Sequence, residues 1–164
     1  KAEREQILQE ARSQLTAHLK SRPKDGEAQA LLATILGELI AGDSDRGAKF
    51  GQKSVKLMNQ AVENAPNSPR VAVLRGTWLL FMPAMYGGGL DRAESELDRA
   101  ITLFEKEPST APWPNWGRAD AFAWRGQIAV KKGERAKAKA FYERGLAEEP
   151  DAMWIRHKLL PKVN

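Results

Sequence analysis

The stretch ADAFAWRGQIAVKKGERAKAKAFYERGLAEEPD, residues 119–151, decides the fold of this chain. Apolar residues recur at helical spacing on both sides of Lys132-Gly133, and Pro150 stops the second segment. The stretch therefore predicts two amphipathic helices joined by a tight turn. Because one hairpin of this size cannot bury both of its faces, we expect neighbouring hairpins to pack against it. Small residues stand where two helices would have to touch, at Gly126, Ala138 and Gly145.

The second helix of this stretch carries a spacing that recurs elsewhere in the chain. Ala138 is followed by Tyr142 four residues later, Gly145 three residues after that, and Pro150 after five more. A small residue lets two helix axes approach, the large one fills the adjoining groove, and proline ends the helix. The further copies are Ala11, Leu15, His18 and Pro23; Ser54, Met58, Ala61 and Pro66; and Ala93, Leu97, Ala100 and Glu105, where glutamate stands in the proline position.

This pattern resembles the tetratricopeptide repeat (TPR), a helical hairpin repeated along the chain. The first helix matches the repeat in part, through Phe122, Arg125-Gly126 and Ala129, and the second helix matches well. The resemblance implies an all-α, TPR-like α-solenoid, a right-handed superhelix of about eight antiparallel helices. Residues 67–162 also resemble bacterial TPR proteins with a glycine-rich loop in the middle repeat. Such proteins are commonly exported or lipid-anchored, which implies a periplasmic or envelope location, with the cytoplasm as the alternative.

We expect residues 1–164 to form one domain that is divided by its repeats. Residues 45–54 are polar and glycine-rich, and we expect them to form a loop inserted into the first full repeat. The predicted division is a half repeat over 1–25, a repeat with that loop over 26–68, a repeat with Gly-rich and Pro/Trp-rich insertions over 69–118, a regular repeat over 119–152, and a capping helix over 153–164.

Composition excludes several classes of protein. The chain has no cysteine, which rules out a disulfide framework and a thiol nucleophile. Its longest apolar run, Thr77–Met82, is far shorter than the roughly 18 residues of a transmembrane helix. A net charge of +5 without a basic stripe or groove-reading element predicts no nucleic-acid partner. Because the chain begins at Lys1, a removed export signal or a lipid anchor in a missing N-terminal segment is one explanation, and a shortened chain is another.

Catalytic and cofactor sites are not predicted. The two histidines, His18 and His157, lie at opposite ends of the sequence, and no cluster supplies the three or four ligands that a metal needs. For His18, in a small-residue position of the repeat, we expect a packing role. No nucleophile stands beside a base, so we predict a protein that is not an enzyme. Tyr86-Gly87-Gly88-Gly89 could suggest a phosphate loop, but no lysine follows at the required spacing, and a tight turn is the better interpretation.

Three further features are expected to have structural roles. The loop with Trp113 and Trp116 could form an exposed binding edge, but we expect its indoles to pack over neighbouring helices. Trp78 and Trp124 are expected in the core or in a groove wall. The basic run around Gly133 is expected to be a solvated face, and it consists of Lys131, Lys132, Arg135, Lys137 and Lys139.

The surface built by the first helices of the repeats is the remaining candidate site. Such surfaces bind partners in solenoid proteins, and mixed charge beside apolar groups suits a peptide segment. We therefore predict a scaffold or adaptor that holds a partner protein in a concave groove. The alternative is a small-molecule-binding, transport-associated accessory protein whose pocket is walled by the glycine and tryptophan loops. Helical projection places in the groove Glu27, Thr34, Glu38, Arg70, Thr77, Asp120, Gln127, Lys131, Trp154 and His157.

Overall fold

The computed structural model describes residues 2–41, 44–108 and 116–164 of the chain. Within these ranges the chain is helical, and no β-strand occurs. The elements are α1 (Ala2–Ser21), α2 (Gly26–Ile40), α3 (Ser44–Asn64), α4 (Pro69–Phe81), η1 (Ala84–Tyr86), α5 (Leu90–Lys106), α6 (Arg118–Lys131), α7 (Arg135–Glu148), η2 (Ile155–Leu159) and η3 (Leu160–Lys162).

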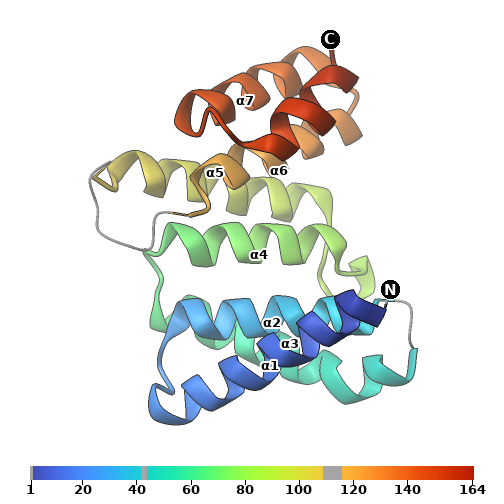
Figure 1. Ribbon diagram of the computed structural model, residues 1–164, viewed down its shortest axis with the longest axis vertical. Helices are drawn as coiled ribbons and strands as arrows, with labels where there is room; N and C mark the ends of the chain where they lie inside the picture. Colours follow the sequence, from blue (N-terminus) through green and yellow to red (C-terminus); the bar gives the residue numbers. More distant parts are fainter. Residues whose placement is uncertain (1, 42–43, 109–115) are drawn as a thin grey trace.

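The helices lie across the long axis of the molecule, and the helical hairpins follow one another along it in chain order (Figure 1). Antiparallel neighbours pair as α2 with α3, α4 with α5, and α6 with α7. The buried side chains form separate clusters along the row, from one shared by α2, α3 and α4 to one shared by α6, α7 and η2. This arrangement confirms the predicted all-α, TPR-like solenoid, because a bundle would gather its core about a single centre.

Each hairpin closes on the small residues that the sequence pattern singled out. Tyr142 of α7 is fully buried, and a methyl group added at Gly126 of α6 would overlap its ring. In the preceding hairpin, a methyl group at Gly76 would lie 2.7 Å from Cγ of the buried Leu97. The two helix axes therefore approach as closely as the missing side chain allows.

A buried hydrogen-bonded relay joins the first hairpin to the second. The indole Nε1 of Trp78 on α4 donates to Ser54 Oγ on α3 at 2.9 Å, and that hydroxyl donates to the Ala33 carbonyl on α2 at 2.8 Å. Ser54 is 3% exposed, so its hydroxyl needs these partners. Trp78 also lies over Gly37, where an added methyl group would be 3.8 Å from its ring. The Ser54 hydroxyl therefore links α2, α3 and α4 through two hydrogen bonds.

The prediction of a loop over residues 45–54 is wrong, because α3 is helical through this segment. Phe50 and Ser54 are buried and stand one helical turn apart, and they extend the stripe that continues with Met58. This burial offsets the roughly 1 kcal/mol that each of Gly47 and Gly51 costs a helix.

The C-terminal capping segment differs from a regular helix. Residues Ile155–Leu159 form a π-helical turn, and a 3₁₀ turn follows over Leu160–Lys162. Pro161 has no N–H and its ring would clash with the carbonyl four residues earlier, so the α-helical pattern cannot continue there. Ile155 and Leu159 are buried, and they pack with Ala119 and Tyr142.

The glycine-rich segment forms the predicted tight turn between α4 and α5. Gly87 has φ +93°, a left-handed conformation that favours glycine, and a methyl group at Gly88 would overlap the Met82 carbonyl. The Gly89 N–H donates to the Leu79 carbonyl at 3.0 Å and anchors the turn to α4. The side chain of Tyr86 in this turn is nevertheless exposed.

His18 does not take the packing role expected from the sequence, but forms a hydrogen bond with the N-cap of α2. Its Nε2 lies 2.8 Å from Asp25 Oδ2, and Asp25 Oδ1 accepts a hydrogen bond from the Ala28 N–H at 3.0 Å as the N-cap of α2. Partial burial raises the pKa of Asp25, but the Ala28 N–H and His18 together outweigh this and lower it below its ordinary 3.8.

We expect Gly126→Ala to lower the free energy of unfolding by about 1–3 kcal/mol, because the added methyl group overpacks the Tyr142 ring. Gly51→Ala is the matched control, since no atom lies within 4 Å of an added methyl group there. It should raise the free energy of unfolding by about 0.5–1 kcal/mol through helix propensity. Urea denaturation followed by circular dichroism measures both values. Equal effects of the two substitutions would contradict the packing argument.

Acid should destabilise the protein partly through Asp25. Because its folded-state pKa is lowered, its carboxylate stabilises the fold fully above the ordinary pKa of 3.8, and this contribution is lost as the pH falls through the folded-state pKa. Asp25→Asn keeps a capping oxygen without a titrating charge. The urea midpoint of this variant should fall less than that of the wild type between about pH 6 and about pH 3. His18→Gln should reduce the pH response in the same direction.

Candidate functional site

Three aromatic side chains that are far apart in the sequence meet on the surface, and we call them the aromatic row: Phe81 at the end of α4, Trp124 in α6 and Trp154 just before η2. The Phe81 and Trp124 rings meet edge to face, with centroids 5.6 Å apart and planes at 88°. The Trp124 and Trp154 rings are 4.9 Å apart and tilted by 56°. Both geometries are favourable for aromatic pairs, so the rings hold each other in place.

The aromatic row is buried on one side and open on the other. Trp124 is half-buried against an apolar cluster that includes Leu79 and Ile128. Phe81 is 65% exposed and Trp154 is 38% exposed. Large apolar groups that are fixed in position yet accessible to solvent are typical of binding surfaces. Other exposed large apolar side chains from the same elements and their flanks are Met85, Tyr86, Val130 and Met153.

The α6 residues predicted for the groove share a helix face with this row. Asp120, Trp124, Gln127 and Lys131 are spaced by four, three and four residues, which aligns them along one side of α6. Asp120 and Lys131 are exposed, whereas Gln127 donates to the Tyr142 hydroxyl at 3.1 Å. Protein atoms around the Asp120 carboxyl remove enough water to raise its pKa, although solvent still reaches it.

Two predicted groove residues on α4 are buried, and this corrects their assignment. Arg70 is only 4% exposed and its guanidinium makes a bidentate contact with Glu107, at 2.7 and 3.2 Å. It also lies 5.6 Å from the centroid of the Phe104 ring. Thr77 is 9% exposed, and its hydroxyl is within 3.1 Å of the Val73 carbonyl. Both residues stabilise the packing of α4 and offer little surface to a partner.

The predicted groove residues on α2 are half-buried and already bonded. Glu27 accepts a hydrogen bond from the Ser68 hydroxyl at 2.7 Å, and the Thr34 hydroxyl donates to the Ala30 carbonyl at 3.0 Å. Glu38 pairs with Arg4 of α1. These contacts hold α1 and α4 against α2. At the C-terminal end of the solenoid, His157 is exposed and follows Trp154 by three residues in the sequence.

Sequence reasoning missed Phe81, which became the most exposed member of the aromatic row. Its position just before Met82-Pro83 marks the end of a helix, but nothing in that pattern shows which neighbour covers its ring. Trp124 was expected in the core or in a groove wall, and its half-buried position fits the second role. Trp116 packs against the first core cluster, as predicted for its loop, whereas Trp113 lies outside the described residues.

An ion cluster fixes α6, and with it the aromatic row, against α5. Arg125 is 8% exposed, and it contacts Glu94 at 2.5 Å and Asp98 at 2.6 Å. Lys132 contacts Asp91 at 2.8 Å and also Glu94, and the hydrogen bonds to these two carboxylates raise its pKa. Charge-assisted contacts of this kind are directional, so they set the register between the two helices.

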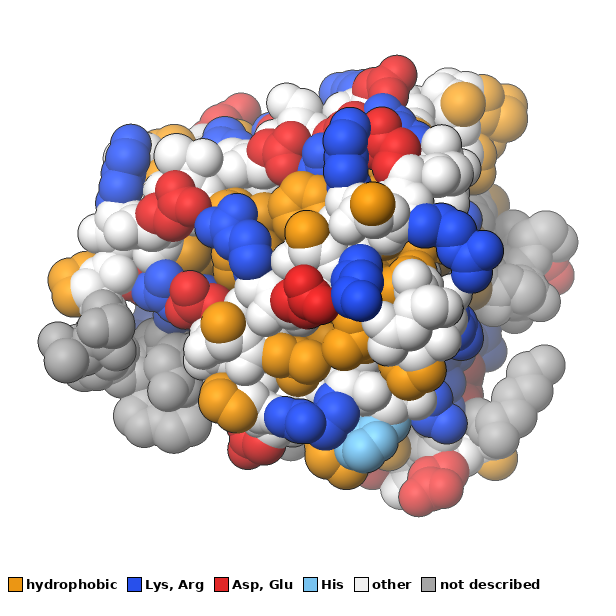
Figure 2. Space-filling model, turned by 90° about the horizontal axis from the view of Figure 1, so that it is seen from above, with side chains coloured by type: hydrophobic (Ala, Val, Ile, Leu, Met, Phe, Trp, Pro, Cys, Tyr) orange, Lys and Arg blue, Asp and Glu red, His pale blue; other side chains and the backbone are white. Residues whose placement is uncertain are grey.

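Charged side chains of both signs cover much of the surface seen from the C-terminal end, with apolar patches between them (Figure 2). Within the described residues, no group of three or more histidine, aspartate or glutamate side chains is close enough to hold a metal ion. None of the helices in the described ranges combines the length and the hydropathy required to cross a bilayer.

The fold places the chain among TPR-like helical solenoids. No protein-family model matches it, and no curated protein matches its sequence. Two solved structures of MamA are similar in fold. One gives a TM-score of 0.58 at 17% identity, covering 98% of this chain and 74% of the MamA chain. The other gives a TM-score of 0.59 at 17% identity, covering 91% and 72%. At this identity the likeness shows the fold alone.

Arg70→Ala should destabilise the protein by about 3 kcal/mol, because Glu107 would lose its buried partner. The free energy of unfolding in urea measures the loss. The double substitution Arg70→Met with Glu107→Leu removes both charges and should recover most of it. If Arg70→Ala left the stability unchanged, the structural role of this pair would be wrong.

Proposed function

We propose that this protein is a non-catalytic interaction scaffold that binds a segment of a partner protein along the aromatic row. The observation that supports this most directly is the fixed, exposed contact of Phe81, Trp124 and Trp154. TPR-like solenoids present extended surfaces of this kind to partners. Exposed aromatic side chains held rigid by their neighbours lose little conformational entropy on binding, so they make strong anchors.

The residues on α6 give the proposed site a polar border. Asp120 and Lys131 stand on the same helix face as Trp124, one turn before it and two turns after it. A partner segment would place apolar side chains on the rings and polar groups at these two positions. The proposed binding surface, which consists of the aromatic row, Asp120 and Lys131, is therefore smaller than the groove predicted from the sequence, since Arg70 and Thr77 are buried.

The alternative function, a small-molecule-binding accessory protein, has less support. Two cavities of about 350 and 430 Å³ in the described chain are open depressions rather than enclosed pockets, and charged residues contribute to the lining of both. Drug-sized ligands are usually held in enclosed, mostly apolar pockets. An envelope location remains a prediction from the resemblance to exported TPR proteins.

Substitutions in the aromatic row test the proposed function. The purified chain is immobilised and used to capture partners from extracts of its own cells, and captured proteins are quantified by mass spectrometry. The affinity of the purified partner is then measured by calorimetry. Phe81→Ala and Trp154→Ala should each weaken it at least about tenfold, as expected for anchors worth roughly 2 kcal/mol.

Ile7→Ala is the matched control, because Ile7 is also a large apolar residue, 59% exposed, but lies on α1. This variant should bind as the wild type does. Unfolding curves establish that all three variants are folded. Equal affinity of the Phe81 and Trp154 variants and the control would refute the proposed surface. Thermal stabilisation by a metabolite without any protein partner would instead support the alternative.

A further inference from the structure

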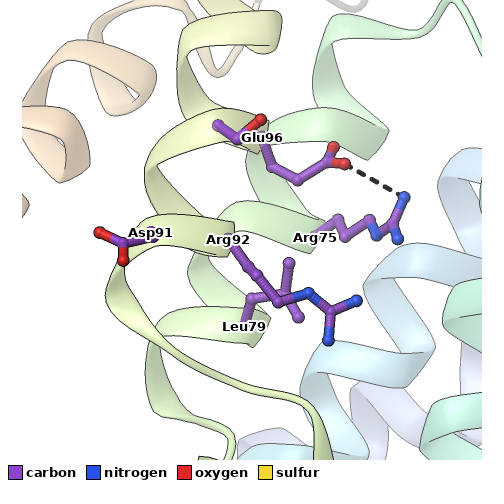
Figure 3. Close-up of a pocket in the computed structure, with 6 residues that line it drawn as sticks. Arg75, Leu79, Asp91, Arg92 and Glu96 are labelled. Atoms are coloured by element: carbon purple, nitrogen blue, oxygen red, sulfur yellow. Dashed lines mark ion pairs between the residues drawn. The ribbon is translucent and has the colours of Figure 1, made fainter.

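A depression of about 350 Å³ between α4 and α5 is separate from the aromatic row. Its walls come from Arg75 and Leu79 of α4 and from the first turns of α5, where Asp91, Arg92, Ser95 and Glu96 contribute. In the described chain α3 makes no contact with α5, so no second helix of the first hairpin closes this opening. Arg75 and Arg92 extend to the same side of it, whereas Asp91 points away (Figure 3).

The carboxylates that line the depression are already paired with cations. Glu96 accepts from Arg75 at 3.1 Å, and its other oxygen accepts from Arg99, also at 3.1 Å. Asp91 is bonded to Lys132 on α6 at 2.8 Å. Neither carboxylate contacts Arg92, which forms no ion pair with any described residue. The positive charge of Arg92 is therefore the uncompensated charge of this depression.

Hydrogen-bond donors remain available around that charge. One Arg92 nitrogen donates to the Gly87 carbonyl, which fixes the guanidinium above the turn, and a guanidinium carries five N–H groups. The Ser95 hydroxyl is exposed and has no hydrogen-bond partner among the described residues. Arg75 keeps N–H groups beyond its contact with Glu96. Two guanidinium groups and a hydroxyl around one opening are the donor set that binds a phosphoryl group.

The geometry points to a second binding site, in which Arg75, Arg92 and Ser95 bind a phosphate group. The buried Leu79 side chain forms the apolar wall of the site. The phosphate belongs either to a free small molecule or to a phosphorylated side chain of a partner. Both sources present the same three oxygens to the two arginines.

Inorganic phosphate tests the site directly. In an amide chemical-shift titration at constant ionic strength, the residues that move should be those at 75, 79 and 91–96, with saturation at millimolar phosphate. Arg92→Gln should weaken binding at least tenfold, and Ser95→Ala about threefold, because it removes one hydrogen bond from an uncharged donor at a solvent-exposed position. Arg144→Gln is the matched control, since it makes the same change of charge on α7, at an exposed arginine paired with Glu105, and should leave binding unchanged.

The source of the phosphate is decided by comparing ligands. Tighter binding of a phosphoserine peptide than of inorganic phosphate assigns the site to a partner protein, and equal binding assigns it to a free anion. Acetate that produces the same shifts at the same concentration would overturn the phosphate assignment. Shifts that are as large in the Arg92 variant as in the wild type would overturn the site.

Discussion

The fold depends on the contact between a large side chain of one helix and a glycine or alanine of its partner. Tyr142 lies where Gly126 leaves room, and Leu97 lies where Gly76 does. Met58 is buried in the same cluster as Ala33. Each contact lets the two helix axes of a hairpin approach closely, and the next hairpin packs on the surface that the paired helices form. Larger side chains in place of these glycines and alanines would push the paired helices apart and break up the core clusters between them.

The same contact explains how much of the fold was readable from the sequence. The spacing that places small and large residues on one helix face involves only residues close together in the sequence. It can therefore be recognised without knowledge of the rest of the fold. The second-helix positions Ser54, Met58, Ala93 and Leu97 are all buried as the pattern predicts. In α1 the copy at Ala11 and Leu15 is only half-buried, because α1 lies at the end of the row and its backbone approaches that of α2 alone among the described helices.

What the sequence could not reveal depends on contacts between distant elements. Gly47 and Gly51 are poor helix formers, yet Phe50 and Ser54 keep their segment helical by burying against α2 and α4. Arg70 projects toward the predicted groove on a helical wheel, but Phe104 of α5 and Glu107, the C-cap of α5, enclose it. A helical period gives the direction of a side chain, whereas its exposure is decided by whichever neighbour packs there. For this reason the predicted groove residues Asp120 and Lys131 on α6 are accessible, whereas Arg70 and Thr77 on α4 are buried.

Trp78 gives the junction between the first two hairpins an uneven stiffness. On one side its indole is tied to Ser54, and through it to α2, while on the other side α3 and α5 do not touch. In a row of hairpins, bending is easiest at the junction where the fewest helices of adjacent hairpins are in contact. Bending at this junction would therefore open the side between α3 and α5, because the other side is held by the packing of Val71 and Leu74 of α4 against α2 as well as by the Trp78–Ser54 bond.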